Sequence, residues 1–463
     1  MAEGNDRTVD APLLGTVVRI ALGVDDQFQE GRALVVLESM KMEHVVAAEW
    51  SGTVTKVLVE VGQTVDPGQA LLATLEGAID LATATATVAA DVDEIRADLA
   101  ESIARHELGL DPARPESVER RRRTGQRTTR ENVDDLCDEG TFVEYGALAI
   151  AAQRRRRSFD DLITRTPADG LVSGVGKVDG HPTVVLSYDY TVLAGTQGVH
   201  NHTKKDRLFE LAERMKLPVV FFTEGGGGRP GDTDSSGMTG LDTMAFALFA
   251  ELSGLVPLVG ITSGRCFAGN AALLGCCDVI IATEGSNIGM GGPAMIEGGG
   301  LGVFTPDEVG PMDVQVPNGV VDIAVADEAE AVAVAKRYLS YFVDAKADAG
   351  SPTGSTAGST AGSTAGSTAG SSGGHDRTWE CADQRLLRHV VPENRLRIYE
   401  VRDVIDTLAD TDSVLEVRRG FGAGMITALI RVEGRPMGVI ANSPAHLGGA
   451  IDAEGSDKAA RFM

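Results

Sequence analysis

Lys41 lies in the segment Glu38-Ser39-Met40-Lys41-Met42-Glu43-His44, where two methionines flank it and carboxylates stand on both sides. A lysine between two apolar side chains at a chain reversal is presented at the surface, as loop residues generally are. The pattern therefore predicts an attachment point for a swinging cofactor. A surface lysine in a methionine-containing turn is the alternative interpretation.

A glycine-rich segment could hold an anionic ligand. Residues 224–229 read Glu-Gly-Gly-Gly-Gly-Arg and directly follow the apolar run 217–223. The glycines, Gly226 and Gly227 among them, let the backbone approach a ligand closely with N–H groups free to donate. No Gly-Lys-Ser/Thr follows, so the segment is not a P-loop. A mobile surface loop remains the alternative.

A second glycine-containing turn lies within residues 263–274, where a strand is expected to run sharply into an alanine-rich helix. The first turn of a helix has unpaired N–H groups and the positive end of the dipole. We expect the backbone of Phe267, Ala268, Gly269 and Asn270 to stabilise an oxyanion, such as the enolate of a thioester. Tight helix–strand packing would also explain the small residues.

An internal repeat must position Lys41. Residues 12–37 and 49–75 are two copies of one unit. The pairs keep a constant offset: Gly15-Thr16-Val17 with Gly52-Thr53-Val54, Val24 with Val61, Phe28 with Val65, Gly31 with Gly68, and Ala33-Leu34 with Ala70-Leu71. Short alternating strands broken by Gly and Pro predict two small sheets related by a pseudo-twofold axis, which together form a flattened barrel. Lys41 would then lie at the hairpin between the copies.

The glycine segments lie in a stretch of alternating strands and helices, which indicates an α/β core. The expected strands are 183–188, 217–223, 256–262 and 278–282, and the expected helices are 207–215, 241–252 and 270–274. The run 217–223 is nearly continuously apolar, as expected for a strand buried on both faces. A second α/β segment begins near Trp379, with a helix at 401–408 and strands at 424–432 and 437–441.

Composition excludes several classes of protein. A net charge of −25 and a pI near 4.7 argue against a nucleic-acid binder, whose binding surface would be basic. The five cysteines form no CxxC pair, so we expect no disulfide framework, no metal site and a reducing cytoplasm. The N-terminus is not a signal peptide, and no apolar run is long enough to span a membrane.

The repeat with its Met-Lys-Met triplet resembles the biotinyl domain of biotin carboxyl carrier proteins. The resemblance implies covalent biotin on Lys41, attached by a biotin protein ligase. A lipoyl domain shares the fold and ranks second, because it usually lacks the flanking methionines.

Residues 115–343 resemble the N-terminal subdomain of acyl-CoA carboxyltransferases, which has a crotonase-like fold, and residues 379–463 resemble the start of the C-terminal subdomain. The matching segments are Arg127 to Leu136 with Gly140 to Glu144, Asp189 to Val192 with Gly195-Thr196, His202 to Ala212, Pro218 to Val220 with the glycine loop to Arg229, Phe267 to Ala271, Ile288 to Pro293, and Ala441 to Pro444. Asn270 stands where many members of the family have glycine.

The resemblance implies that a carboxyl group carried on biotin is transferred to the α-carbon of an acyl-CoA of the acetyl or propionyl type. Backbone donors at residues 267–270 would stabilise the enolate, with no dedicated side-chain base. Family positions near the CoA and acyl groups fall on Lys205, Gly226, Gly227, Arg229, Gly291 and Gly292. The arginine runs 120–123 and 154–157 could contact the CoA phosphates, although a solvated charged face explains them equally well.

The resemblance also divides the chain into domains. We expect a biotinyl domain at 9–77, a linker and helix at 78–114, an N-terminal carboxyltransferase subdomain at 115–347, a flexible Gly-Ser-Thr-Ala linker at 348–376, and a partial C-terminal subdomain at 377–463. In the family, the transfer site forms between the N-subdomain of one chain and the C-subdomain of another, which implies a homo-oligomer.

The sequence contains no ATP-grasp-like region and stops before the family's second oxyanion turn. We therefore expect a separate biotin carboxylase subunit to charge the biotin, and either a fragment or a second polypeptide that completes the C-subdomain. Weak or absent transferase activity of this chain alone follows as an expectation. Two alternative functions stay open: a non-catalytic carrier and assembly scaffold, or a biotin-dependent decarboxylase subunit.

Overall fold

The computed structural model describes residues 5–77, 92–234, 243–343, 379–394 and 396–463. The chain forms two compact units, Met1–Ile95 and Arg96–Met463. Residues 78–91 of the predicted linker and helix (78–114) and the whole predicted linker at 348–376 lie outside the described residues. Within the described part of the chain, no helix has the length and apolar character needed to cross a bilayer.

The first unit consists of two four-stranded antiparallel sheets. Their strand orders are β1-β8-β6-β3 and β5-β4-β2-β7. The strands are β1 (Asp6–Asp10), β2 (Gly15–Ile20), β3 (Gln27–Phe28), β4 (Ala33–Ser39), β5 (Met42–Ala47), β6 (Gly52–Val57), β7 (Thr64–Val65) and β8 (Ala70–Glu76). Buried apolar side chains from both sheets form one shared core, which includes Val17, Leu34, Leu37, Val54, Leu71 and Leu72.

The predicted two-copy repeat is confirmed by how these strands pair. β2, β3 and β4 of the first copy correspond to β6, β7 and β8 of the second. The short strand of each copy pairs with the other copy, so that β3 joins β6 and β7 joins β2. This exchange ties the two copies together, because each sheet contains one strand of the other copy.

The second unit is α/β, as predicted. Its first part contains α1 (Ala97–Glu107), α2 (Pro115–Arg123), α3 (Thr129–Leu136), β9 (Val143–Glu144), α4 (Phe159–Arg165), β10 (Leu171–Val178), β11 (His181–Tyr188), α5 (Val199–Met215), β12 (Val219–Phe222), α6 (Ala245–Glu251), β13 (Leu258–Thr262), β14 (Arg265–Phe267), α7 (Gly269–Gly275), β15 (Val279–Thr283), β16 (Asn287–Gly289), α8 (Pro293–Gly298), α9 (Met312–Gln315), β17 (Ile323–Val325) and α10 (Glu328–Val343).

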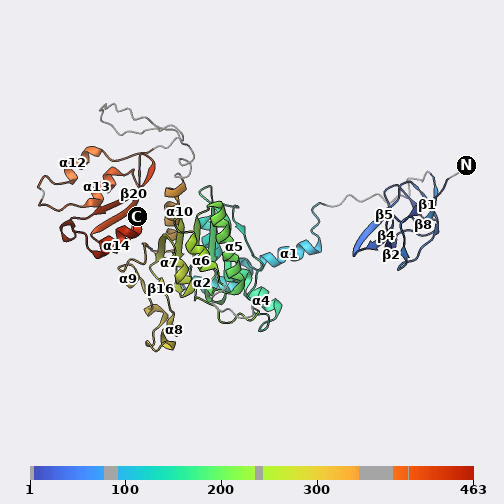
Figure 1. Cartoon of the computed structure of the whole chain (residues 1–463), viewed down its shortest axis with the longest axis horizontal. Helices are drawn as coiled ribbons and strands as arrows, with labels where there is room; N and C mark the ends of the chain where they lie inside the picture. Colours follow the sequence, from blue (N-terminus) through green and yellow to red (C-terminus); the bar gives the residue numbers. More distant parts are fainter. Residues whose placement is uncertain (1–4, 78–91, 235–242, 344–378, 395) are drawn as a thin grey trace, which may run out of the picture. The chain divides into compact units, whose positions relative to one another are not determined.

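A seven-stranded sheet organises this part, in the order β17-β15-β13-β12-β11-β10-β9. Strands β11, β12, β13, β15 and β17 run parallel, and β10 is antiparallel to both β9 and β11. Side chains of α3 and α10 pack on one face and those of α5 and α6 on the other, near the middle of Figure 1. Helices on both faces explain why β12 is buried at every residue, as its apolar run predicts.

Predicted and observed element bounds differ most at α5. The helix begins at Val199 rather than at residue 207, because Asn201 caps it: the Gly198 N–H donates to Asn201 Oδ1 (3.1 Å). The early turns face buried polar partners instead of an apolar core, so the apolar spacing that marks the later turns is absent there.

The last part of the chain packs a three-stranded antiparallel sheet, β18-β19-β20, against helices. Its elements are α12 (Leu387–Val390), α13 (Val401–Leu408), β18 (Leu415–Val417), β19 (Met425–Val432), β20 (Arg435–Asn442) and α14 (Ala453–Phe462). Backbone carbonyls join it to α10: Arg431 Nη2 donates to Ser340 O (2.8 Å), and Arg337 Nη2 donates to Val414 O (2.7 Å).

Candidate functional site

Lys41 lies at the tip of the β4–β5 hairpin, as predicted. Ser39 pairs with Met42 across the hairpin, so Met40 and Lys41 form a two-residue turn. Both have positive φ, 52° and 66°, the conformation in which such turns usually place Asn-Gly. Met40 is 95% exposed and Met42 66% exposed. The strands therefore impose the turn and hold the exposed lysine away from the body of the unit.

In the second unit, β14 turns into α7 at Ala268. This residue has φ 53° and ψ −122°, a region that a residue with a Cβ rarely adopts. Its N–H donates to Gly289 O (2.9 Å), and the Phe267 N–H donates to Gly225 O (2.9 Å). Two of the four predicted oxyanion donors are thus used to hold the turn in place.

Gly269 and Asn270 occupy the first turn of α7. Backbone N–H groups at this position have no preceding carbonyl within the helix. A Cβ on Gly269 would lie 3.2 Å from the Phe246 ring, so a larger residue would crowd this turn. Of the predicted donors, these two are the ones whose location suits a developing negative charge.

The glycine loop lies directly against this turn. Gly227 has φ +84°, and a Cβ there would lie 2.6 Å from the Ala268 Cβ. A Cβ on Gly225 would lie 2.2 Å from Gly195 O. The Gly226 N–H donates to Ala194 O (3.0 Å). Close backbone approach to two neighbouring turns is therefore the physical reason for glycine at 225 and 227.

Gly291 and Gly292 connect β16 to α8. A Cβ on Gly292 would lie 3.6 Å from the Phe267 ring. Phe267 and Ala268 thus have the glycine loop on one side and the Gly291-Gly292 loop on the other. Three segments that are separate in sequence, and that were each predicted to line the site, meet at this turn.

The Asn270 side chain is fully buried and does not extend into open space. Its Oδ1 accepts from the Gly227 N–H and from Gln197 Nε2, both at 3.1 Å. Its Nδ2 donates to Thr223 O (3.1 Å) and to Gly195 O (3.3 Å). The Asn270 amide therefore links α7 to the glycine loop and to the Gly195 turn. A glycine at position 270 would leave the space between these segments unfilled.

Lys205, a predicted CoA contact, is also fully buried. Its Nζ donates to Tyr188 OH (2.6 Å) and to Gln197 Oε1 (3.0 Å). Burial lowers the pKa of Lys205 from 10.5 to about 7. The amine is thus engaged inside the protein, one hydrogen-bonded residue away from Asn270.

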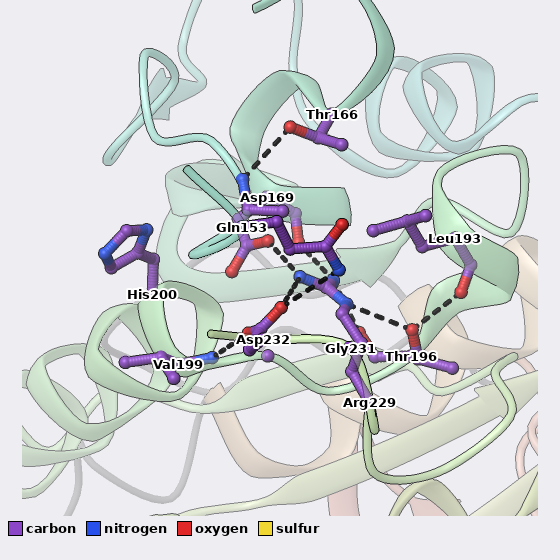
Figure 2. Close-up of polar contacts among 12 residues, drawn as sticks. Gln153, Thr166, Asp169, Leu193, Thr196, Val199, His200, Arg229, Gly231 and Asp232 are labelled. Atoms are coloured by element: carbon purple, nitrogen blue, oxygen red, sulfur yellow. Dashed lines mark hydrogen bonds and ion pairs between the residues drawn. The ribbon is translucent and has the colours of Figure 1, made fainter. Parts of the chain in front are cut away.

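Arg229, a second predicted CoA contact, is 6% exposed and forms an ion pair with Asp169 at the centre of Figure 2. It also lies 3.5 Å from Asp232, and its Nη2 donates to Thr196 O (2.9 Å). Asp232 Oδ2 in turn accepts from the Val199 N–H (2.9 Å) at the start of α5. Burial raises the pKa of Asp169, and Arg229 opposes that shift.

The arginine runs divide between the interior and the surface. Arg121 is buried and forms an ion pair with Glu224 (2.8 Å), the residue that begins the glycine loop. Its neighbours Arg120, Arg122 and Arg123 are exposed. Burial raises the pKa of Glu224, and Arg121 opposes the shift. The first run therefore contributes one structural cation beneath the site rather than a continuous basic patch.

Sequence reasoning missed Gln197, Asp169 and the role of Glu224. Gln197 directly follows Gly195-Thr196, a pair that matches the family, and this position was the only indication in the sequence that Gln197 lies near the site. Asp169 lies in Pro167-Ala168-Asp169-Gly170, a typical turn sequence. Nothing in residue type alone indicates that it pairs with an arginine far along the chain.

Two family models match the chain. The one described as "Carboxyl transferase domain" matches residues 120–463, and the one described as "Biotin-requiring enzyme" matches residues 7–74.

Curated relatives include the methylmalonyl-CoA carboxyltransferase 12S subunit of Propionibacterium freudenreichii subsp. shermanii, which is 31% identical over 347 residues, 75% of this chain and 61% of that protein. The biotin-dependent long chain acyl-coenzyme A carboxylase beta4 subunit of Mycobacterium tuberculosis is 31% identical over 380 residues, 79% of this chain and 65% of that protein. The chain thus spans less than two thirds of the length of these two relatives.

Solved structures are also similar. A single-chain, multi-domain long-chain acyl-CoA carboxylase matches with a TM-score of 0.71 and 52% identity, over 99% of this chain and 43% of that one. The transcarboxylase 12S hexamer with hydrolysed methylmalonyl-CoA bound matches with a TM-score of 0.63 and 29% identity, over 80% of this chain and 68% of that one.

Proposed function

This chain belongs to the carboxyl transferase domain family and also contains a biotin-requiring domain, and from this premise we propose that it is a component of a biotin-dependent acyl-CoA carboxylase. It would hold biotin covalently on Lys41 and transfer a carboxyl group to the α-carbon of an acyl-CoA. The observation that carries the proposal is the meeting of the Phe267–Asn270 turn with two glycine loops.

Lys41 fits covalent biotin because its amine is exposed at a hairpin tip with no body of protein around it. When bound there, biotin supplies a carrier for an activated carboxyl group. Met40 and Met42 flank the lysine, and the paired strands β4 and β5 carry the turn that presents it. We infer that the two sheets form the flattened barrel of such carrier domains.

We propose that the second unit has a crotonase-like fold and that its backbone N–H groups stabilise the negative charge that develops on the substrate. The N–H groups of Gly269 and Asn270 would donate to the thioester oxygen as it becomes an enolate oxygen. In characterised enzymes, removing one such donor costs about 3–4 kcal/mol of transition-state stabilisation. Lys205 and Arg229 would act from within, by positioning the glycine loop, rather than by touching CoA.

The substrate is proposed as an acyl-CoA of the acetyl or propionyl type. The segment after Gly292 also presents apolar surface next to the site, which a longer acyl chain could cover. Its exposed apolar residues are Met295, Leu301, Val303 and Phe304, and Met290, just before the Gly291-Gly292 pair, is exposed as well. A panel of acetyl-, propionyl- and palmitoyl-CoA therefore belongs in the first assay.

Further parts of the proposal follow from the family. A biotin carboxylase subunit would charge the biotin, a biotin protein ligase would attach it, and the chain would form a homo-oligomer. The five cysteines are all free, which supports a reducing cytoplasmic location.

Biotinylation is tested first. The chain is co-expressed with biotin protein ligase, and biotin is detected by streptavidin blot and intact mass. Lys41→Ala should abolish labelling, whereas Lys56→Ala, at an exposed lysine on β6 of the same unit, should not. Labelling that survives Lys41→Ala would contradict the assignment of the attachment site.

Transfer is tested next with the biotinylated chain, a biotin carboxylase, ATP, labelled bicarbonate and the acyl-CoA panel. Labelled carboxyacyl-CoA supports the proposal. A biotinylated chain that neither carboxylates acyl-CoA nor decarboxylates malonyl- or methylmalonyl-CoA without ATP would instead be a carrier and scaffold. Decarboxylation alone would point to a decarboxylase subunit.

A further inference from the structure

We propose that the side-chain amide of Asn270 positions the carboxyl-transfer site and is itself held in orientation by Gln197 and Lys205. Its buried amide makes four hydrogen bonds of 3.1 to 3.3 Å, two to donors and two to carbonyl oxygens. Through them it holds the glycine loop and the Gly195 turn against the Phe267–Asn270 segment. The catalytic part of this inference rests on the proposed function, whereas the structural part does not.

The orientation of the Asn270 amide is determined by its partners. Gly227 offers an N–H and can only donate, whereas Thr223 and Gly195 offer carbonyl oxygens and can only accept. A flipped amide would place like groups together at all three contacts. The side chain therefore uses its full hydrogen-bonding capacity in one orientation only.

Gln197 receives its orientation from Lys205. Lys205 Nζ donates to Gln197 Oε1 (3.0 Å), which turns the oxygen of the Gln197 amide toward the lysine. The Gln197 Nε2 then faces Asn270 Oδ1 (3.1 Å). Lys205 is itself anchored to Tyr188 OH on β11 (2.6 Å). A buried chain of hydrogen bonds thus runs from the central sheet to the glycine loop.

The amides also occupy the space that the neighbouring glycines leave. A Cβ on Gly225 would lie 2.2 Å from Asn270 Nδ2, and a Cβ on Gly269 would lie 3.0 Å from Gln197 Nε2. Gly225 and Asn270 therefore depend on each other: the loop approaches closely enough to bond the amide only because residue 225 has no side chain.

Asn270→Gly removes the whole side-chain amide from the centre of these four contacts. In this chain the same change would leave buried groups without partners, namely Gln197 Nε2, the Gly227 N–H, Thr223 O and Gly195 O. Unsatisfied buried groups are unfavourable, so the loop should shift or loosen. A displacement of about 1 Å at a reacting centre can lower turnover roughly 100-fold.

The test compares wild type with Asn270→Gly, Asn270→Asp and Gln197→Met. The aspartate keeps the shape of the side chain but sets an acceptor against two carbonyls, and the methionine removes one link of the chain without disturbing the Gln197 backbone. Val259→Ala, in the buried strand β13, is the control for lost stability alone. Steady-state kinetics are measured in the acyl-CoA assay, and hydrogen–deuterium exchange is measured on residues 195–198 and 224–229.

We expect both Asn270 variants to lose about 10- to 100-fold in kcat, with a change of less than about threefold in KM for acyl-CoA and faster exchange in both segments. Gln197→Met should fall between these variants and wild type. Val259→Ala should keep kcat and the exchange of these two segments, although it unfolds at lower denaturant concentration.

Asn270→Gly with wild-type kcat and exchange would overturn the inference. So would a kcat loss that Val259→Ala reproduces at equal stability, because the role would then be structural only. If wild type itself transfers no carboxyl group, the proposed function fails, and the exchange rates alone decide whether Asn270 holds the loop. Unchanged exchange in Asn270→Asp would then refute it.

Discussion

Replacing Gly227 with alanine should damage the site through two separate steric effects. Gly227 has φ +84°, and an L-residue in a left-handed conformation costs about 1–2 kcal/mol. The new Cβ would also lie 2.6 Å from the Ala268 Cβ, and overpacking of this kind costs about 1–3 kcal/mol. Together, Gly227→Ala should lower the free energy of unfolding by about 2–5 kcal/mol.

The same loop offers a matched control. A Cβ on Gly228 meets nothing within 4 Å and needs no positive φ, so Gly228→Ala should change stability by no more than about 0.5 kcal/mol. Urea unfolding in a Trp50→Phe background lets Trp379 fluorescence report on the second unit alone. In the acyl-CoA assay, Gly227→Ala should also lose kcat, because Ala268 must move.

Equal stability and equal turnover of the two alanine variants would refute this reasoning. It would mean that the glycine loop can withdraw from Ala268 at no cost, and hence that the close approach is incidental. A loss of stability with full turnover would contradict only the link between Ala268 and catalysis.

Two further predictions concern buried charges. Arg121→Gln leaves Glu224 buried without its cation and should lower the free energy of unfolding in urea by about 3–5 kcal/mol. Arg120→Gln, at an exposed neighbour, should lower it by no more than about 0.5 kcal/mol. Equal effects of the two substitutions would contradict the ion-pair role. Burial lowers the pKa of His202 from 6.5 to about 3, so the unfolded chain binds a proton between these pH values and the folded chain does not. Stability should therefore fall as pH drops below 6.5, by about 2 kcal/mol at pH 5, and His202→Phe should remove that part of the loss; identical pH profiles of variant and wild type would count against it.

Features set by local pattern could be predicted from the sequence. The alternation of strands and turns in the repeat gave both sheets, and the apolar run before the glycine loop gave β12. The helix 401–408 was predicted with its observed bounds, because its apolar spacing is strong. The hairpin at Lys41 followed from the position of the residue between two copies.

Long-range pairing could not be predicted in the same way. In a run of four arginines on a helix, the period of 3.6 residues directs about one of them inward, but only the tertiary structure determines which. Here it is Arg121, because Glu224 lies beneath α2 at the end of β12. Likewise, residue type does not reveal that Lys205 and Arg229 are buried, so the sequence offers only their family position.

Backbone strain is a further feature that residue type conceals. A glycine in the sequence suggests a backbone position with positive φ, whereas an apolar residue gives no such indication. An apolar residue also lacks the polar side chain that could stabilise this conformation by a local hydrogen bond. Among the described residues, the apolar ones with positive φ are Met40, Ala168, Leu193, Ala194, Ala268 and Leu447. All but the last adjoin Lys41, the Arg229 ion pair, the glycine loop or the start of α7.

Strain of this kind persists only where surrounding contacts over-determine the conformation, and it concentrates at functional sites. The contacts can be named. At Ala268, the N–H is held by Gly289 O, and the carbonyl accepts from the Ala272 N–H (2.9 Å each). At Ala194, the carbonyl accepts from the Gly226 N–H. These hydrogen bonds fix the Ala268 turn against Gly289 and the Ala194 turn against the glycine loop, and the Gly227 N–H joins that loop to Asn270 on α7. We therefore expect small backbone changes at Gly227 or Asn270 to affect turnover more than their effect on stability alone would.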